Sequence, residues 1–146
     1  MKTKLCQCLV MFAAIFLLLG QLPVVAAEPK KASLEAPTDK TVLAGRYHRG
    51  DGTGYNVTIT LSDAGSYTSE WYGCLGKYGE ACGTWKLRGR KLRFTTTKEK
   101  GMMKGYLTTL EVTKFAEAWI LVPMQKEDRD FYEKWGVSQF SCFHKQ

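Results

Sequence analysis

Residues 55–61 have the sequence Tyr-Asn-Val-Thr-Ile-Thr-Leu, in which odd positions are apolar or aromatic and even positions are polar. This period of two is typical of a β-strand with one face against a core, because successive side chains of a strand point to opposite sides. Residues 62–65 (Ser-Asp-Ala-Gly) follow with the composition of a turn, where glycine supplies a positive φ. Four side chains are therefore expected to point inward: Tyr55, Val57, Ile59 and Leu61.

The same alternation recurs on both sides of this strand. Residues 119–122 (Trp-Ile-Leu-Val) differ, because they are continuously apolar, as in a strand that is covered on both faces. Eight strands are predicted: 45–48, 55–61, 67–71, 85–88, 91–95, 105–115, 119–122 and 140–143. Such short strands at regular spacing are typical of a β-sandwich or a closed barrel.

One segment has a helical period instead. Met124, Asp128, Phe131 and Trp135 are spaced three or four residues apart, and Gly136 follows at the position of a C-terminal cap. We predict a short helix over residues 126–135, with its apolar side chains covering one end of the sheet structure.

These elements favour an all-β fold with one domain. A chain of 146 residues has room for one core rather than two. A barrel is favoured over a sandwich because closure removes exposed strand edges. We predict a single antiparallel up-and-down barrel of about eight strands, with one short helix before the last strand, over residues 42–146.

The N-terminal segment has the pattern of an export signal. Lys2 and Lys4 precede an apolar run, and Val25-Ala26-Ala27 provides a cleavage site before Glu28. The apolar run is shorter than a membrane-spanning helix requires. We therefore expect a signal peptide over residues 1–27, a flexible linker over residues 28–41, and a secreted or periplasmic protein without a transmembrane segment after cleavage.

The start of the predicted barrel, Gly45-Arg46-Tyr47, together with the strand order and the late helix, resembles the lipocalin family. In that family a Gly-x-Trp motif lies on the first strand and a basic residue from the last strand packs across the Trp. Tyr47 stands in the place of that Trp here, Lys145 is the basic residue available at the end, and a literal Gly-x-Trp occurs in mid-chain at residues 83–85. The resemblance covers residues 43–146 in outline, and it implies binding of a small apolar ligand.

A cavity inside such a barrel is expected to be lined by aromatic residues from several strands. The predicted ligand-binding residues are Tyr47, Tyr55, Tyr67, Trp71, Trp85 and Phe94. The alternative is that these side chains fill a packed core, as they do in many small barrels. Met102 and Met103 lie at a predicted turn, where flexible thioethers suit varied apolar ligands.

Three cysteines remain after signal cleavage. Cys74 and Cys82 are expected at the ends of consecutive strands, and an oxidising compartment favours a disulfide between them. Cys142 is then unpaired and is expected as a buried thiol. Cys142, His144 and His48 offer no fourth ligand, so no metal site is predicted.

Residues 86–104 form a basic hairpin with eight lysines and arginines and one acidic residue. Strand parity places four cations on its outer face: Lys86, Arg88, Lys91 and Arg93. The structural interpretation is solubility and protection of a strand edge. The functional interpretation is binding to an anionic surface, meaning lipid headgroups, an acidic polysaccharide or an acidic protein.

The sequence gives little support to other functions. The net charge is +7, but an exported chain without a nucleic-acid-binding motif is a poor candidate for binding nucleic acid. Only two histidines are present, and residues 49–54 match neither a phosphate-binding nor a calcium-binding loop. We therefore predict a binding module that is not an enzyme and needs no cofactor. The two alternatives are a ligand carrier and an envelope interaction module that uses the basic hairpin.

Overall fold

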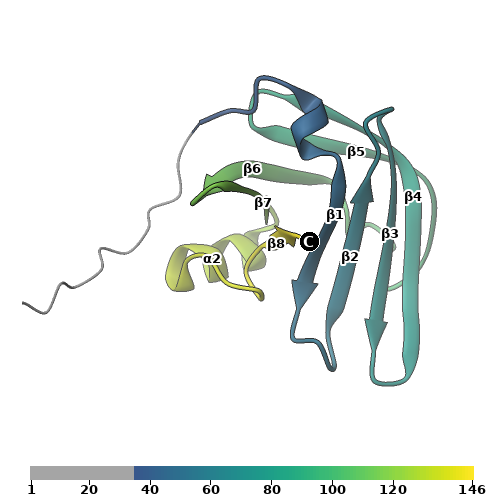
Figure 1. Ribbon diagram of the computed structural model, residues 1–146. Coiled ribbons are helices and arrows are strands. Elements are labelled where there is room, and N and C mark those ends of the chain that lie inside the picture. The colour runs from purple at the N-terminus through teal and green to yellow at the C-terminus, as the bar shows by residue number, and fades with distance from the viewer. Residues whose placement is uncertain (1–34) are drawn as a thin grey trace, which may run out of the picture.

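The computed structural model describes residues 35–146, which form a closed antiparallel barrel of eight strands in sequential order (Figure 1). The predicted signal peptide and residues 28–34 of the predicted linker lie outside the described residues. The strands are β1 (Gly45–Gly50), β2 (Asn56–Leu61), β3 (Ser66–Gly73), β4 (Gly76–Arg88), β5 (Lys91–Gly101), β6 (Thr109–Phe115), β7 (Ala118–Pro123) and β8 (Phe143–Lys145). Helix α2 (Lys126–Trp135) precedes the last strand. The predicted barrel and helix are therefore confirmed.

The barrel interior is filled by the apolar side chains that alternate along the strands. Val57, Ile59 and Leu61 of β2 are at most 2% exposed, as their period of two predicts. They pack in one cluster with side chains from the other strands, namely Tyr47, Tyr67, Trp85, Leu92, Leu110, Val112, Leu121 and Phe143. This continuous packing means that the middle of the barrel is a core rather than a cavity.

The β3–β4 and β4–β5 hairpins are longer than their sequences predict. The β3–β4 turn consists of Cys74 and Leu75, and β4 begins directly after it at Gly76. β5 pairs with β6 only between Lys91 and Arg93, so residues 94–101 of β5 extend beyond β6. β5 therefore has no strand partner on its β6 side at the end where β3 ends and β4 begins, and we call this the open end of the barrel.

The last strand is displaced from the predicted range 140–143. Residues 139–141 form a turn, and β8 begins at Phe143, where it pairs with both β1 and β7. This short strand closes the barrel with two residue pairs on each side.

The described part of the predicted linker lies against the barrel. Pro37 is buried, and Asp39 caps the 3₁₀-helix η1 (Lys40–Leu43) by accepting hydrogen bonds from Thr41. Leu43 is fully buried in the core. Pro37 is thus packed, and Asp39 and Thr41 form a cap, within the predicted linker over residues 28–41, whose flexibility stays a prediction.

Helix α2 lies beside β6, β7 and β8 (Figure 1). The expectation that its apolar side chains cover one end of the barrel is wrong, because Phe131 and Trp135 are 39% and 62% exposed. Tyr132 instead packs on a small cluster of Ile120, Val122 and Cys142 outside the barrel. None of the residues of α2 is buried, so polar contacts hold much of the helix in place.

The predicted disulfide between Cys74 and Cys82 is wrong, because both cysteines are free. Cys74 lies in the hairpin turn, whereas Cys82 lies within β4 opposite Thr68. Cys82 is eight positions after Cys74, and the six steps from Gly76 to Cys82 rise along β4 by a total of about 20 Å. A disulfide requires Cα atoms within about 7 Å.

Within residues 35–146, no helix has the length and apolarity needed to cross a membrane.

Candidate functional site

An aromatic groove lies at the open end of the barrel and has a volume of about 530 Å³. We use the name aromatic groove for the space lined by Gly54, Tyr55, Trp71, Tyr78, Gly101 and Met102. Its walls come from the β1–β2 loop, the end of β3, the start of β4 and the end of β5. Tyr78 and Met102 are 37% and 57% exposed, so apolar surface faces solvent here.

The β1–β2 loop holds Tyr55 and Gly54 in position through Asp51. One carboxylate oxygen of Asp51 accepts backbone hydrogen bonds from Thr53 and Gly54, both at 2.8 Å, and from Tyr55 at 3.0 Å. The backbone hydrogen bonds from Tyr55 and Thr53 lower the pKa of Asp51 to about 2. The carboxylate is therefore ionised in neutral solution, and it fixes the loop that forms one wall of the groove.

Behind this wall, three aromatic rings pack in a chain. The ring of Tyr55 meets that of Trp71 edge-on with centroids 4.9 Å apart, and Trp71 lies 5.0 Å from Tyr106. The hydroxyl groups of Tyr55 and Tyr106 are 2.8 Å apart and share a hydrogen bond. The groove therefore has a rigid aromatic floor, because each ring is held by at least one neighbour.

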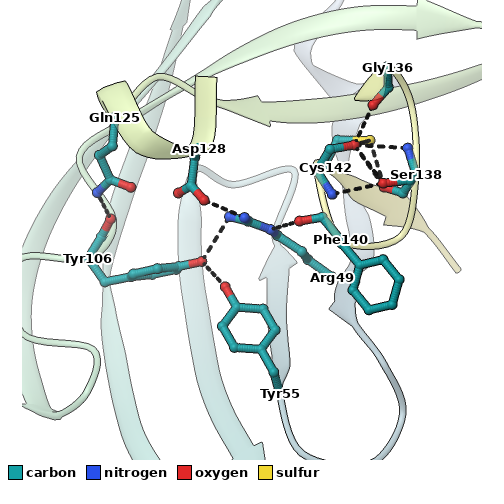
Figure 2. Close-up of polar contacts among 10 residues, drawn as sticks. Arg49, Tyr55, Tyr106, Gln125, Asp128, Gly136, Ser138, Phe140 and Cys142 are labelled. Carbon is teal, nitrogen blue, oxygen red and sulfur yellow. Dashed lines mark hydrogen bonds and ion pairs between the residues drawn. The ribbon is translucent and has the colours of Figure 1, made fainter. Parts of the chain in front are cut away.

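A buried arginine supports this floor from inside the barrel (Figure 2). Arg49 is 5% exposed and forms an ion pair with Asp128 of α2. Its guanidinium also donates to the carbonyl of Phe140 at 2.7 Å and to the hydroxyl of Tyr106 at 3.2 Å. The guanidinium carbon lies 5.7 Å from the centre of the Tyr55 ring, a cation–π distance.

The charge of Arg49 is compensated inside this network. Burial acts to lower the pKa of Arg49, but the hydrogen bond with Asp128 and the adjacent Tyr106 and Tyr55 outweigh it and raise the pKa above its ordinary value. Burial also raises the pKa of Tyr106 and of Tyr55. Both tyrosines are therefore neutral at physiological pH and are not poised to act as bases.

Gly101 brings two walls of the groove together. A Cβ added at this position would lie 2.0 Å from the carbonyl oxygen of Tyr78, and its φ is +57°. The backbone N–H of Met102 donates to the same carbonyl at 3.1 Å. This close approach turns the chain so that Met102 lies in the groove, while Met103 is fully buried in the core.

The six predicted ligand-binding residues are placed in two groups. Tyr55 and Trp71 line the aromatic groove. Tyr47, Tyr67 and Trp85 are at most 3% exposed, and Phe94 meets the ring of Tyr67 edge-on at 4.8 Å. The polar atoms of this second group bond within the protein: Tyr47 to the carbonyl of Leu43, Tyr67 to the Thr96 hydroxyl, and Trp85 to the carbonyl of Ser62. These four residues belong to the core, as the alternative interpretation expects.

Tyr78, Tyr106 and Arg49 are the members of the site that sequence reasoning missed. Tyr78 lies between Gly76 and Gly79, in a stretch that belongs to none of the predicted strands. The inward parity of Tyr47 extends to position 49, so it marks Arg49 as a charged side chain directed into the barrel. That parity is the signal that identifies Arg49 from sequence.

A second polar cluster surrounds Cys142, on the right of Figure 2. The thiol is fully buried under α2, donates to the carbonyl of Ser138 at 3.2 Å, and lies 3.4 Å from Nε2 of His144. The prediction of a buried, unpaired Cys142 is therefore confirmed. His48 hydrogen-bonds to Asn56 instead, and residues 35–146 contain no group of three metal-ligating side chains.

The four predicted anion-binding residues share one outer surface of the β4–β5 hairpin. Lys86, Arg88, Lys91 and Arg93 are all exposed. Lys86 is directly opposite Arg93, and Arg88 is directly opposite Lys91. We refer to these four residues as the basic face. Lys86 lies eight residues along β4 from Tyr78, about 26 Å of strand length, so the basic face is separate from the aromatic groove.

Comparison with protein-family models, with curated proteins and with solved structures finds no match to this chain. The resemblance to lipocalins therefore stays an expectation from the sequence.

Proposed function

We propose that this protein is an exported, lipocalin-like binding module that holds a small apolar or amphipathic molecule in the aromatic groove. The observation that carries the proposal is the groove itself, with its volume of about 530 Å³ and its walls of Tyr55, Trp71, Tyr78 and Met102. Small-molecule sites have volumes of about 300 to 1,000 Å³ and are lined mainly by apolar and aromatic side chains.

Preorganisation supports this function. The Arg49 network and the Asp51 turn hold Tyr55 and Trp71 before any ligand arrives. A ligand then loses its own freedom but does not need to order the aromatic floor, which favours affinity. Met102 is the flexible member of the lining, and its thioether can adapt to different ligand shapes.

The position of the groove suggests how the ligand would be held. The barrel centre is packed, so the ligand would lie across the open end, with its apolar part on Trp71 and Tyr78. The solvent side of the groove leaves room for a polar group. This arrangement fits an amphipathic ligand better than one that is apolar throughout.

The test is binding of N-phenyl-1-naphthylamine, a neutral probe that the basic face does not attract, followed by probe fluorescence. Met102→Ser puts a polar side chain in the groove and is expected to weaken binding about 5- to 10-fold, the effect of removing most of one apolar contact. Met124→Ser is the matched control, since Met124 is 40% exposed and does not line the groove.

Unchanged affinity for Met124→Ser together with a loss for Met102→Ser supports the proposal. Equal affinities for both variants and the native protein, or absence of probe binding, would contradict it. Circular dichroism checks that both variants keep the native fold.

A further inference from the structure

The outer side of the β4–β5 hairpin carries three consecutive cross-strand pairs of polar residues. Thr84 faces Thr95, Lys86 faces Arg93, and Arg88 faces Lys91. All six residues are exposed. Successive pairs on one side of a strand are about 7 Å apart, so the pairs form a regular ladder of hydroxyl groups followed by cations.

The cations of the basic face have no ion-pair partner in the part of the chain that the structure describes. Among residues 35–146, no carboxylate lies within ion-pair distance of Lys86, Arg88, Lys91 or Arg93. Glu111 is directly opposite Lys91 on β6, but it is occupied by ion pairs with Arg90 and Arg129. Like charges directly opposite each other destabilise a sheet, so the protein retains an arrangement that an external anion would relieve.

The apolar residues of the same strands point away from this surface. Trp85 and Leu92 are at most 3% exposed, and Leu87 and Phe94 are partly buried against the same core. The basic face therefore offers cations and hydroxyl groups but no apolar anchor. Membrane-bound surfaces insert apolar side chains, and protein interfaces centre on aromatic anchors. Single-stranded nucleic acid is held by stacking on aromatic rings, which this surface also lacks.

We propose that the basic face binds an acidic polysaccharide, with carboxylate or sulfate groups on Lys86, Arg88, Lys91 and Arg93 and sugar hydroxyl groups on Thr84 and Thr95. Arginine pairs with carboxylate and sulfate in bidentate geometry, and the threonine hydroxyls act both as donors and as acceptors. A repeating polyanion matches a repeating ladder of cations. This site is separate from the aromatic groove and does not depend on the function proposed for it.

Binding of the full protein to immobilised polygalacturonate and to dextran sulfate tests the proposal. The double variant Lys86→Ser/Arg93→Ser is expected to weaken binding about 5- to 30-fold, the loss of two exposed charge contacts. The matched control is Arg46→Ser/Lys104→Ser, which removes the same charge from two exposed residues outside the basic face. The control variant is expected to change the affinity by less than about twofold. Binding of the native protein is expected to weaken as the ionic strength rises.

Three outcomes would overturn the proposal. The control variant could weaken binding as much as the double variant, which would make net charge the cause. Vesicles of equimolar phosphatidylcholine and phosphatidylglycerol, or duplex DNA, could bind more tightly than both polysaccharides. Native protein could also fail to bind either polysaccharide at low ionic strength. Circular dichroism and the urea midpoint serve as folding controls for the double variant and for the control variant.

Discussion

The Arg49 guanidinium joins three segments that are far apart in the sequence. It extends from β1 into the barrel, pairs with Asp128 of α2, and donates to the carbonyl of Phe140 in the turn before β8. An ion pair at so buried an arginine is costly to break, because the remaining charge has no water to replace its partner.

Replacing Asp128 by Asn tests this role. The Asp128→Asn variant leaves Arg49 buried without a countercharge, and we expect the free energy of unfolding to fall by about 2 kcal/mol, less than for a fully buried pair because Asp128 is partly exposed. Asp130→Asn is the control, since Asp130 forms an exposed ion pair with Lys126 within the helix. Its expected effect is within about 0.5 kcal/mol. Urea unfolding of both variants measures the difference, and equal effects would contradict the role of Arg49.

We expect His144 to make the stability of the protein depend on pH. The hydrogen bond with Cys142, followed by the Ser138 backbone, raises the pKa of His144 above 6.5. The protonated histidine is thus favoured in the native state. Its contribution to the free energy of unfolding is therefore complete below pH 6.5 and is lost as the pH rises through the pKa of His144 in the native state. We expect Cys142→Ala to lower the His144 pKa measured by NMR titration. A His144 pKa that is the same in this variant would refute the assignment.

At the residue scale, strand parity predicted the inward direction of Tyr55 and Trp71, and it placed the four cations of the basic face outside. It did not separate a residue of the core from one at the open end of the barrel. Tyr47 and Tyr55 have the same parity, but only the second lies where β5 has passed beyond β6. That difference depends on strand lengths, which the local sequence does not determine.

The β4–β5 hairpin is the element that creates both proposed sites. It is long enough to place the aromatic groove at one end and the basic face at the other. The sequence misled at its start, where Gly76, Lys77, Tyr78 and Gly79 have the composition of a loop. Gly79 is required by packing, because an added Cβ would lie 2.7 Å from the carbonyl oxygen of Lys100 and from the nitrogen of Met103. A glycine needed for close approach of two strands thus resembled a glycine of a turn.

Helix α2 was predictable in its range but not in its packing. Its apolar residues have helical spacing, and Gly136 ends it with a φ of +70° and an N–H donated to the carbonyl of Tyr132. Which side faces the barrel is decided by Asp128 and Arg129, whose partners Arg49 and Glu111 are remote in sequence. Periodicity cannot identify such partners.

In the turn of the β6–β7 hairpin, Ala116 has a backbone conformation that suits glycine better than alanine. Ala116 has a φ of 55°, at the first central position of a two-residue turn between the paired residues Phe115 and Ala118. Glycine adopts this conformation without the clash of a Cβ. We expect Ala116→Gly to raise the free energy of unfolding by about 0.5–1 kcal/mol. This value is the cost of the left-handed conformation for alanine, minus the larger conformational entropy that glycine loses on folding. Chemical denaturation measures the free energy of unfolding of this variant. A value below that of the native protein would show that Ala116 is not strained.

At the scale of the whole molecule, hydrogen-bonded closure and a continuous core hold the barrel together. β8 completes the closure, and the core cluster contains residues from all eight strands. The closed barrel could be predicted because eight alternating strands with short turns leave few other ways to pair every edge. The disulfide was predicted wrongly because the position of the hairpin turn was misplaced.

Stability should accordingly be independent of reducing agents. We expect the urea midpoint of the protein to be the same with and without tris(2-carboxyethyl)phosphine. The urea midpoint of the Cys82→Ser variant is expected to equal that of the native protein. A Cys74–Cys82 bridge would contribute about 2–3 kcal/mol. A midpoint that falls by a corresponding amount on reduction would contradict the hairpin geometry described here.

The aromatic groove is the place where we propose that the ligand binds. The most direct test of this proposal is the set of indole N–H signals in a ¹H–¹⁵N spectrum during titration with N-phenyl-1-naphthylamine, with Trp71→Phe used for assignment. The chain has four tryptophans, and Trp71 lines the groove, whereas Trp85 is in the core and Trp135 is exposed on α2. We predict that the Trp71 signal moves and that those of Trp119 and Trp135 do not. A Trp71 signal that stays fixed while the probe binds, or a shift confined to Trp135, would contradict the proposal.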